Sequence, residues 1–374
     1  MKLQVLLISP TDPNHPVEYK YLTGGENTYT QTLLHFPPDG IEFTYFTQAL
    51  KLGWISYHPL YHFLLFLQKI KLLPPGPRTY VFKVRKHFDL VYAHAHPIKI
   101  VGEKVPVVVS DSSSNIIFLT EYLKLSSLVI KLWYICKRFV FGGFGIIDCE
   151  VNLRGAQGFF VFSKWARHIK KEKFDLSNVE VIYPGLAQPR KKPAGHKRKI
   201  DIKFLFVGVW FERKGGRILL KVFRNLSKTY TNISLTILGE LPPDIKIGKT
   251  EPITHKDFVS HSKLQYYFAT HDVLVHVPIE VEGYGMTVVE AMANSMCVVV
   301  SDVCALPELV EDGDSGLVVK ANSEVDLEKK LMRLIKSSQL RLNLGRTARR
   351  RFQAKFALRV FQHELRSIFV KAIK

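Results

Sequence analysis

The sequence predicts an α/β protein made of two doubly wound, parallel-sheet domains. Short apolar stretches typical of buried strands alternate with helical stretches in both halves of the chain, for example at residues 88–96 and 204–207. The length of 374 residues exceeds what one ordinary hydrophobic core accommodates. Residues 190–199 are polar, basic and interrupted by Pro and Gly, as in a linker. We expect a first domain over residues 1–189, the linker over 190–199, a second domain over 200–350 and a C-terminal helix over 351–374.

Composition limits the classes of protein and of partner. Hydrophobic residues make up 47% of the chain, which is typical of a folded protein and excludes a disordered one. The 53 Lys and Arg residues outnumber the 33 Asp and Glu residues, and the net charge of +20 favours an anionic partner. That partner is nucleic acid, a membrane surface or a phosphorylated substrate. The four cysteines have no Cys-x-x-Cys spacing, so we expect buried free thiols in a reducing compartment.

The start of the chain predicts a strand and not a targeting segment. Residues 1–8 contain one lysine and a short apolar run, followed at once by Ser9 and Pro10. Every stretch of about 20 residues contains charges or polar breaks, so the sequence predicts no membrane-spanning helix.

Gly24 and Gly25 lie between the first predicted strand and the first predicted helix. They form either a plain turn or a point where a phosphate or sugar approaches the backbone. They do not belong to a Gly-x-Gly-x-x-Gly fingerprint, so no dinucleotide cofactor is expected.

Three polar residues follow buried strands of the first half. His94 and His96 end one strand, and Asp111 follows another. Ligands of open α/β sheets bind at the carboxyl ends of the strands, so each of the three is either a site residue or a structural one. No carboxylate at ligand spacing joins the two histidines, and we expect no metal.

Two stretches of the first half, residues 54–73 and 116–141, are rich in aromatic and aliphatic residues. Almost all of their charged residues are Lys or Arg. They form either core helices or a surface that dips into a bilayer while its lysines meet anionic headgroups. In the second case the bilayer would receive Trp54, Phe63, Phe66 and Trp133, and the headgroups would meet Lys124, Lys131, Lys137 and Arg138.

The second half begins with a predicted phosphate site. A buried strand at residues 204–207 leads through Gly208 to Arg213, Lys214 and Gly215, and a helix follows. Two cations beside a helix N-terminus suit a diphosphate, because arginine binds phosphate oxygens in pairs and the helix start offers free N–H groups. The Walker order of residues is absent.

Glu282 and Glu290 are two carboxylates on either side of a tight glycine turn and a helix start. Glycines let the backbone approach a ligand, and the helix start offers N–H groups to a phosphate. The residues concerned are Gly283, Tyr284, Gly285, Met286 and Thr287. Alone, this stretch fits a surface glutamate followed by a turn and a core helix as well as it fits a ligand site. Arg213 and Lys214 at the preceding matching strand end favour the ligand site.

The last part of the chain, residues 324–374, predicts helices that are basic on one face. We expect Arg349, Arg350 and Arg351 to face water rather than a phosphate.

Four segments of the second half, in order and at normal spacing, resemble the retaining glycosyltransferases of the GT-B fold, family 4 type (glycosyl transferases group 1). They are Gly208 with Arg213 to Gly215, Glu282 with Glu290, residues 298–302 and residues 307–316. The first half resembles the family more loosely, through Gly24 and Gly25, the His94 and His96 strand end, and Tyr183 to Gly185. Many relatives carry a histidine where this chain has Ser110 and Asp111, which leaves His94 and His96 as the candidates.

The resemblance implies two Rossmann-like domains that face each other across a cleft, with a nucleotide-sugar donor held mostly by the second and the acceptor by the first. Arg213 and Lys214 would then hold the diphosphate, and Glu282 would contact the donor sugar near the reacting carbon. Glu290 would accept hydrogen bonds from the ribose, and backbone N–H groups at residues 284–287 would assist the phosphates. The terminal helix would cross back to the first domain. No cofactor and no metal are implied, because the two cations supply the metal's charge.

The implied chemistry places positive charge on the sugar ring and negative charge on the departing diphosphate. Fixed cations near the second and a carboxylate near the first lower the barrier. Retention without a second enzyme carboxylate indicates front-face attack, in which the leaving phosphate accepts the acceptor's proton, unlike the paired-carboxylate route of glycosidases.

The basic charge and the two aromatic stretches favour a lipid-linked or membrane-associated saccharide acceptor. They also favour a cytoplasmic protein that is peripheral on an anionic membrane surface, the inner face of the cell membrane. A soluble acceptor, or a GT-B sugar-nucleotide epimerase or phosphorylase, are the alternatives. A nucleic-acid binder is not expected, because no recognised nucleic-acid-binding module is present.

Overall fold

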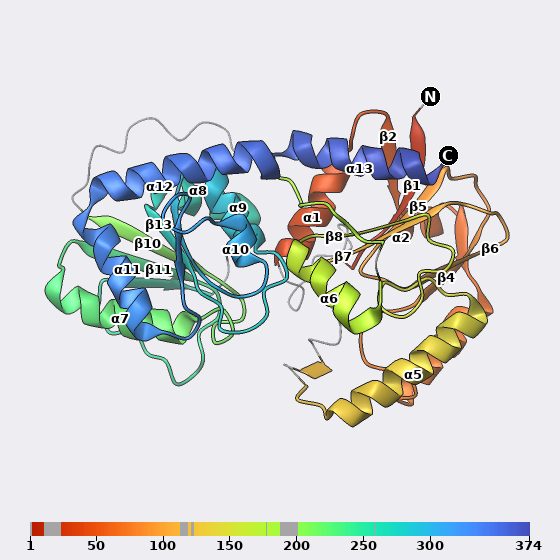
Figure 1. Ribbon diagram of the computed structural model, residues 1–374, viewed down its shortest axis with the longest axis horizontal. Helices are drawn as coiled ribbons and strands as arrows, with labels where there is room; N and C mark the ends of the chain where they lie inside the picture. The colour runs from red at the N-terminus through yellow and green to blue at the C-terminus, as the bar shows by residue number, and fades with distance from the viewer. Residues whose placement is uncertain are drawn as a thin grey trace. The chain divides into compact units, whose positions relative to one another are not determined.

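The computed structural model of the protein divides into two compact α/β units (Figure 1). It describes residues 2–10, 24–112, 119–120, 123–176, 178–187, 201–257 and 259–374. Unit 1 comprises Met1–Pro184 and Arg359–Lys374, and unit 2 comprises Gly185–Leu358. The predicted linker, residues 190–199, lies outside the described residues.

Unit 1 is built on a six-stranded parallel sheet in the order β2-β1-β5-β7-β8-β9. Its strands are β1 (Leu3–Ile8), β2 (Ile41–Tyr45), β5 (Leu90–His94), β7 (Val107–Asp111), β8 (Gly158–Val161) and β9 (Glu180–Val181). Its central strands β5 and β7 are buried throughout, as expected for a parallel sheet covered on both faces. A second, smaller sheet contains β3 (Ile55–Tyr57), β4 (Tyr80–Val84) and β6 (Ile98–Val101).

The helices of unit 1 include one from the far end of the chain. They are α1 (Gly24–His35), α2 (Phe46–Lys51), α3 (Pro59–Lys69), α5 (Ser127–Phe144), α6 (Lys164–Phe174) and α13 (Leu358–Ala372). The ring of Phe369 on α13 lies 5.3 Å from that of Tyr92 in β5, so the last helix packs on the first sheet (Figure 1). Ser163 accepts a hydrogen bond from Ala166 N at 3.0 Å and so caps the start of α6.

The two aromatic, basic stretches are neither core helices nor surface helices throughout. Residues 54–73 contain the short strand β3 before α3, and residues 116–141 overlap the longer helix α5. The expectation that Lys137 meets headgroups is wrong, because its side chain is only 6% exposed and pairs with Asp148 and Glu150. Trp133 is half-buried, and its Nε1 donates to the carbonyl oxygen of Lys71.

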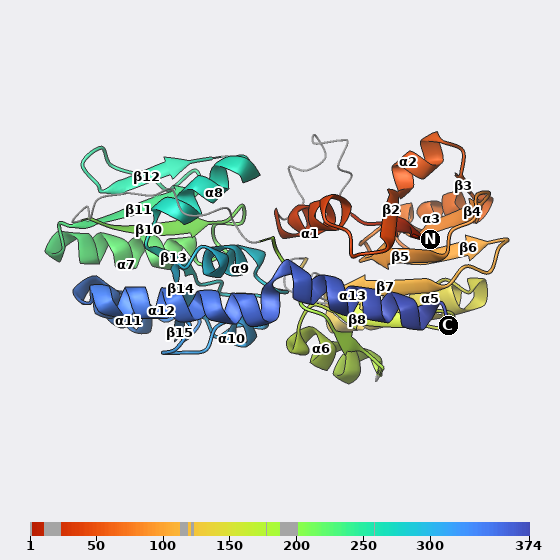
Figure 2. The same cartoon turned by 90° about the horizontal axis from the view of Figure 1, so that it is seen from above.

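Unit 2 contains a second six-stranded parallel sheet, in the order β12-β11-β10-β13-β14-β15 (Figure 2). Its strands are β10 (Ile202–Val207), β11 (Ile233–Leu238), β12 (Ile253–Lys256), β13 (Val273–His276), β14 (Cys297–Ser301) and β15 (Leu317–Val319). Its helical segments are α7 (Gly216–Thr229), α8 (His261–Thr270), α9 (Met286–Ala293), α10 (Leu306–Leu309), α11 (Glu324–Lys336), α12 (Ser338–Arg351) and the π-helical turn Phe352–Phe356. The predicted α/β architecture, with a parallel sheet in each half, is confirmed.

Two arginines of α12 hold other helices of unit 2 in place. Arg349 donates to the carbonyl oxygen of Ala293, the last residue of α9. Arg351 donates from Nε to Leu309 O at 2.7 Å, at the end of α10. The expectation that these side chains face water is therefore wrong: they satisfy carbonyl groups that a helix end leaves without an intrahelical partner.

Across the described residues, no helix is both long enough and apolar enough to cross a membrane. Of the four cysteines, Cys297 alone is buried, and Cys136, Cys149 and Cys304 are partly exposed, so the expectation of buried thiols holds for one of them.

Candidate functional site

Two glycine-capped helix starts lie at the carboxyl edge of the unit 2 sheet, after the neighbouring strands β10 and β13. Gly215 caps α7 with φ +76°, and a Cβ there would lie 2.0 Å from the carbonyl oxygen of Val277. Gly285 caps α9 with φ +96°, and a Cβ there would lie 2.8 Å from Leu306 Cδ2. Only glycine fits both turns, and both helix starts bring partial positive charge to the same sheet edge.

The residues before these helix starts form an ion cluster on a single carboxylate oxygen. Lys214 Nζ contacts Glu282 Oε2, and Arg213 Nη1 lies 3.4 Å from the same oxygen. Arg213 also donates to Val281 O at 2.6 Å. The three charged side chains are 10–14% exposed, and sequence reasoning predicted all of them as site residues. The structure therefore brings the two predicted cations and the predicted carboxylate together.

The cluster has more positive than negative charge. Burial alone would raise the pKa of Glu282, but Lys214, His276 and Arg213 outweigh it and hold that pKa well below its ordinary value. Glu282 is therefore a carboxylate at neutral pH, and two cations face one anion. With two helix starts adjacent, the site suits an anionic ligand.

Gly208 follows β10 and makes room for Lys214. A Cβ on Gly208 would lie 3.0 Å from Lys214 Cγ, so the lysine side chain passes over the glycine. Of the other predicted residues, Tyr284 is buried and packs edge-on against Phe356, with ring centroids 6.5 Å apart. The remaining predicted residues of this turn, Gly283, Met286 and Thr287, are partly exposed around the start of α9.

Glu290 lies further along α9 and is buried. Its Oε1 lies 3.5 Å from Nε2 of Gln265 on α8. Burial raises the pKa of Glu290 to about 8.

Sequence reasoning missed His276, the last residue of β13. Its side chain is 1% exposed, and its Nε2 lies 3.4 Å from Glu282 Oε2. Burial, followed by the charge of Lys214, lowers the pKa of His276. The only signal in the sequence was its position at the carboxyl end of a buried strand, the same signal that drew attention to His94.

The candidates His94, His96 and Asp111 of unit 1 are buried, as are Glu282 and Glu290 of unit 2. His94 ends β5 and is fully buried; its Nδ1 lies 2.8 Å from Ser110 Oγ and its ring stacks on Phe162. His96 is buried, with Nδ1 3.0 Å from Arg78 O. These positions fit structural histidines, and the structure does not bring the two imidazoles to a common ligand. Gly24 and Gly25 form the first turn of α1.

Asp111, the last residue of β7, belongs to a buried ion network. We call it the Asp111 network; its members are Asp111, Tyr134, Lys137, Asp148, Glu150 and Lys170. Lys170 is fully buried, with Nζ 2.5 Å from Asp111 Oδ2 and 4.0 Å from Glu150 Oε1. Burial raises the pKa of Asp111, and Lys170 opposes that shift.

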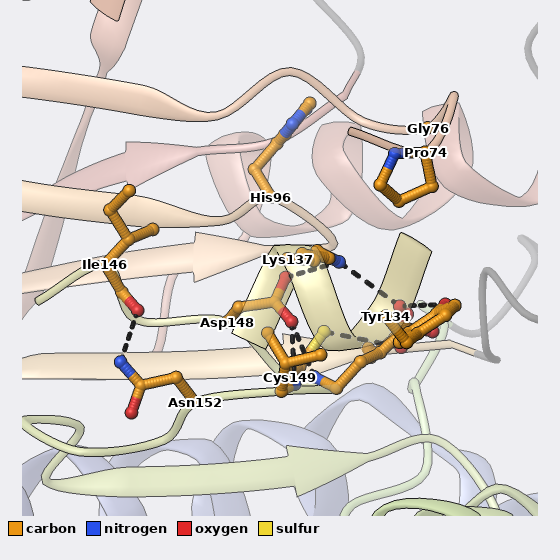
Figure 3. A network of polar contacts seen from close by, with 12 residues as sticks. Pro74, Gly76, His96, Tyr134, Lys137, Ile146, Asp148, Cys149 and Asn152 are labelled. Carbon is orange, nitrogen blue, oxygen red and sulfur yellow. Dashed lines mark hydrogen bonds and ion pairs between the residues drawn. The ribbon is translucent and has the colours of Figure 1, made fainter. Parts of the chain in front are cut away.

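The network continues from Glu150 to helix α5. Lys137 Nζ lies 3.1 Å from Asp148 Oδ2 and 3.4 Å from Glu150 Oε2, and Tyr134 OH donates to Glu150 at 2.7 Å. Figure 3 shows Lys137 pointing toward Asp148. Alternating charges therefore join the end of β7 to α5. Among the described residues, no group of three or more His, Cys, Asp or Glu side chains is arranged to hold a metal ion.

Comparison with known proteins finds a family model that the second half of the chain matches. Residues 187–351 match the family model of glycosyl transferases group 1. An uncharacterized glycosyltransferase of Methanocaldococcus jannaschii is 32% identical over 161 residues, which cover 41% of this chain and 43% of that protein. The capsular polysaccharide biosynthesis glycosyltransferase CapM of Staphylococcus aureus is 23% identical over 55% of this chain and 53% of its own length. The matches thus span about half the length of these curated relatives.

The whole fold has a solved counterpart. The crystal structure of HepE from Anabaena, in complex with UDP and glucose, superposes with a TM-score of 0.64 at 13% identity, covering 98% of this chain and 99% of that one. At that identity the likeness shows the fold alone, and it confirms the predicted GT-B arrangement of two Rossmann-like domains within one chain.

Proposed function

We propose that this chain, which carries a glycosyl transferases group 1 domain over residues 187–351, moves a sugar from a nucleoside-diphosphate sugar to a hydroxyl group of a glycan acceptor. The observation that carries the proposal is the excess of two cations, Arg213 and Lys214, over one carboxylate, Glu282, beside two glycine-capped helix starts. A diphosphate supplies the missing negative charge. The names of the capsular glycosyltransferase and of the UDP and glucose complex fit a reaction of this class.

The reaction proceeds with retention at the sugar's reacting carbon. The bond from that carbon to the diphosphate oxygen breaks while the acceptor oxygen bonds on the same face. The acceptor's proton passes to an oxygen of the leaving phosphate. Arg213 and Lys214 stabilise the negative charge on the diphosphate, and Glu282 stabilises the positive charge on the ring. Glu290 accepts hydrogen bonds from the ribose, and the two cations take the place of a metal.

A panel of nucleotides and nucleotide sugars tests this function. The full chain is heated with UDP, GDP, ADP and their glucose, N-acetylglucosamine and mannose derivatives, because bound ligand raises the melting temperature. We expect stabilisation by one nucleoside diphosphate and its sugar, without added metal. Stabilisation by none of them, confirmed by calorimetry, would contradict the proposal.

A sugar-nucleotide epimerase or a phosphorylase is the second candidate on the same fold. The products formed from the donor alone, or from the donor with inorganic phosphate, distinguish a glycosyltransferase, an epimerase and a phosphorylase. An altered sugar still attached to the nucleotide indicates an epimerase, and phosphate-dependent release of a sugar phosphate indicates a phosphorylase. A glycosyltransferase needs an acceptor for efficient turnover.

The acceptor is lipid-linked or held at a membrane, and the protein is peripheral on the inner face of the cell membrane. Support comes from the α3–α5 surface, which we define by Phe63, Phe66, Ile70, Leu128, Leu132, Ile135 and Phe139. On α5 these residues recur at spacings of four, three and four, so they share one helix face. Phe139 is 84% exposed, and Leu128 and Ile135 are each 66% exposed.

The two helices of this surface are in contact, and basic residues accompany them. Trp133 Nε1 on α5 donates to Lys71 O at 3.0 Å, just past the end of α3, and the rings of Phe63 and Phe144 lie 6.1 Å apart. The exposed basic residues nearby in sequence are Lys69, Lys71, Lys124, Lys131 and Arg138. An apolar face beside basic residues fits an anionic bilayer.

Flotation with vesicles tests the membrane part by itself. We expect the full chain to float with vesicles containing phosphatidylglycerol at low salt and to remain behind with pure phosphatidylcholine. Absence of binding to the anionic vesicles would leave the same chemistry on a soluble acceptor as the better account.

A further inference from the structure

His276 is a buried imidazole whose hydrogen bonds the present arrangement does not satisfy. Its side chain is 1% exposed at the end of β13, and neither ring nitrogen makes a hydrogen bond with a described residue. Its Nε2 nevertheless lies only 3.4 Å from Glu282 Oε2. A buried polar group without a partner is unfavourable, so such a group gains a partner in some functional state or is tolerated at a price in stability.

The oxygen that His276 approaches is already occupied. Lys214 Nζ contacts Glu282 Oε2, and Arg213 Nη1 lies 3.4 Å away from it. Three potential donors therefore converge on one oxygen, and the lysine is by far the nearest. With the lysine in place, Nε2 of the imidazole lies 3.4 Å from this oxygen and makes no hydrogen bond to it.

A diphosphate changes this competition. Its oxygens attract Lys214 and Arg213 away from Glu282, because a phosphate carries more charge than one carboxylate. Glu282 is 8% exposed, so water can replace little of what it loses. A buried carboxylate that loses its cations is destabilised unless another donor replaces them.

We propose that His276 is a positioning residue that donates from Nε2 to Glu282 Oε2 when Lys214 and Arg213 turn to a bound diphosphate. This inference rests on the proposed function. A neutral imidazole suits the role: it is a fixed N–H donor that holds the carboxylate in place, and it brings no third positive charge to compete for the phosphate. The charged groups that face it are Lys214 and Arg213 from the β10–α7 loop and Glu282 from the β13–α9 loop.

Two substitutions separate the donor from the bulk of the side chain. His276→Phe keeps a buried ring without a donor, and His276→Gln retains an N–H group at a similar reach. Calorimetry measures the Kd of UDP and GDP, and of UMP and GMP, for both variants and the unaltered chain. We expect His276→Phe to weaken binding of the preferred diphosphate about 10- to 100-fold, the range for a lost hydrogen bond to a charged group. His276→Gln should restore most of it.

The monophosphate separates positioning from a structural role. It lacks the β-phosphate and draws the two cations from Glu282 less strongly, so its Kd should change much less in His276→Phe. A double-mutant cycle with Glu282→Gln gives a second readout: without the carboxylate charge, the Phe substitution should add little further loss. Unchanged diphosphate affinity in His276→Phe, or equal losses for diphosphate and monophosphate, would overturn the inference.

A measurement on the unaltered chain covers the case in which His276→Phe does not fold. The imidazole N–H proton resonance of His276 should move downfield on addition of the preferred diphosphate and not on addition of its monophosphate. The same shift with both nucleotides, or with neither, would overturn the inference. If the unaltered chain binds no nucleoside diphosphate at all, the proposed function itself fails; if it binds but His276→Phe binds equally well, this inference alone fails.

Discussion

Both units bury a carboxylate beside a lysine at the carboxyl end of a parallel strand, yet the two arrangements differ in charge. In unit 2, Glu282 faces two cations, Arg213 and Lys214, and the lysine is 14% exposed. In unit 1, three carboxylates share the two lysines of the Asp111 network, and Lys170 is fully buried.

We infer from this difference that the unit 2 cluster is a ligand site and that the Asp111 network is a structural anchor. The unit 2 cluster carries excess positive charge beside two helix starts, so an anion completes it. Counted over the described residues, the Asp111 network has three carboxylates for two lysines, both lysines are buried, and Tyr134 on α5 donates to Glu150. Both clusters lie at the carboxyl end of a strand. They differ in net charge and in the exposure of their lysines, and we infer their different roles from these two properties.

The largest effect expected from this comparison is loss of stability on removing Lys170. Lys170→Met leaves Asp111 and Glu150 without their shared cation, and loss of one partner of a buried pair costs about 3–5 kcal/mol. Chemical denaturation should show this loss of free energy of unfolding, and the loss should shrink in acid, because protonated Asp111 no longer needs the lysine. Below the pKa of Asp111, which burial raises, the penalty is least.

Lys171→Met is the matched control, because Lys171 is the exposed neighbour on α6. It should leave the free energy of unfolding nearly unchanged. A Lys170→Met variant as stable as the control at neutral pH would mean that the Asp111 network is not an anchor.

Substitutions in the ion cluster of unit 2 should lower the rate of turnover rather than the stability of the fold. Lys214→Ala and Glu282→Ala should each reduce kcat by at least about 100-fold, by analogy with loss of one preorganised charge. Steady-state assays with the preferred donor and acceptor measure this. Lys221→Ala, an exposed lysine on the same helix α7, is the control and should keep full activity. If both site variants turn over as fast as the unaltered chain, the proposed mechanism is wrong.

The exposed apolar side chains of unit 1 allow a test of the proposed membrane contact, with unit 2 as the comparison. Phe139→Asp removes the most exposed aromatic ring of the α3–α5 surface, and burial of such a ring is worth about 1.5–3 kcal/mol. We expect vesicle binding to weaken by at least about 10-fold in flotation, with donor binding intact. Val325→Asp is the control, since Val325 is 79% exposed on α11 of unit 2. If both variants float equally well with the vesicles, the membrane contact lies outside the α3–α5 surface.

The smallest expected effect concerns pH. Burial raises the pKa of Glu290 to about 8, and accepting from ribose hydroxyls favours its charged form. Affinity for the nucleoside alone should therefore rise with pH up to about 8, by at most about 10-fold per pH unit. Calorimetry with uridine and guanosine avoids titration of the phosphates. Glu290→Gln should make the affinity independent of pH, and a flat profile in the unaltered chain would contradict the ribose role.

Local patterns predicted much of the fold and of the unit 2 site. The alternation of apolar strands with helices predicted both sheets, and the glycines at 215 and 285 predicted the helix starts, because φ above zero favours glycine. Arg213, Lys214 and Glu282 were found because each lies beside such a turn. His276 was missed, because one histidine at the end of a buried strand gives no hint of what faces it.

The misplaced side chains are those whose partners lie outside their own helix. A membrane surface was one of the two alternatives for Lys137, because its helix is otherwise apolar and basic, but Asp148 and Glu150 bury it. Arg351 was assigned to water, but it donates to a carbonyl group 42 residues away. Long basic side chains reach distant acceptors, and their sequence neighbours carry no record of this.

The sequence by itself determined where strands end and helices begin, because those choices depend on a few adjacent residues. Only the tertiary structure decided which charges meet. Lys214 and Glu282 are 68 residues apart and meet because the neighbouring parallel strands β10 and β13 bring their carboxyl ends to one edge. Lys170 and Asp111 are 59 residues apart and meet because helix α6 packs its lysine against the end of β7. The same edge thus holds a cation-rich site in one unit and an enclosed ion network in the other, since burial and partner number are properties of the packed chain.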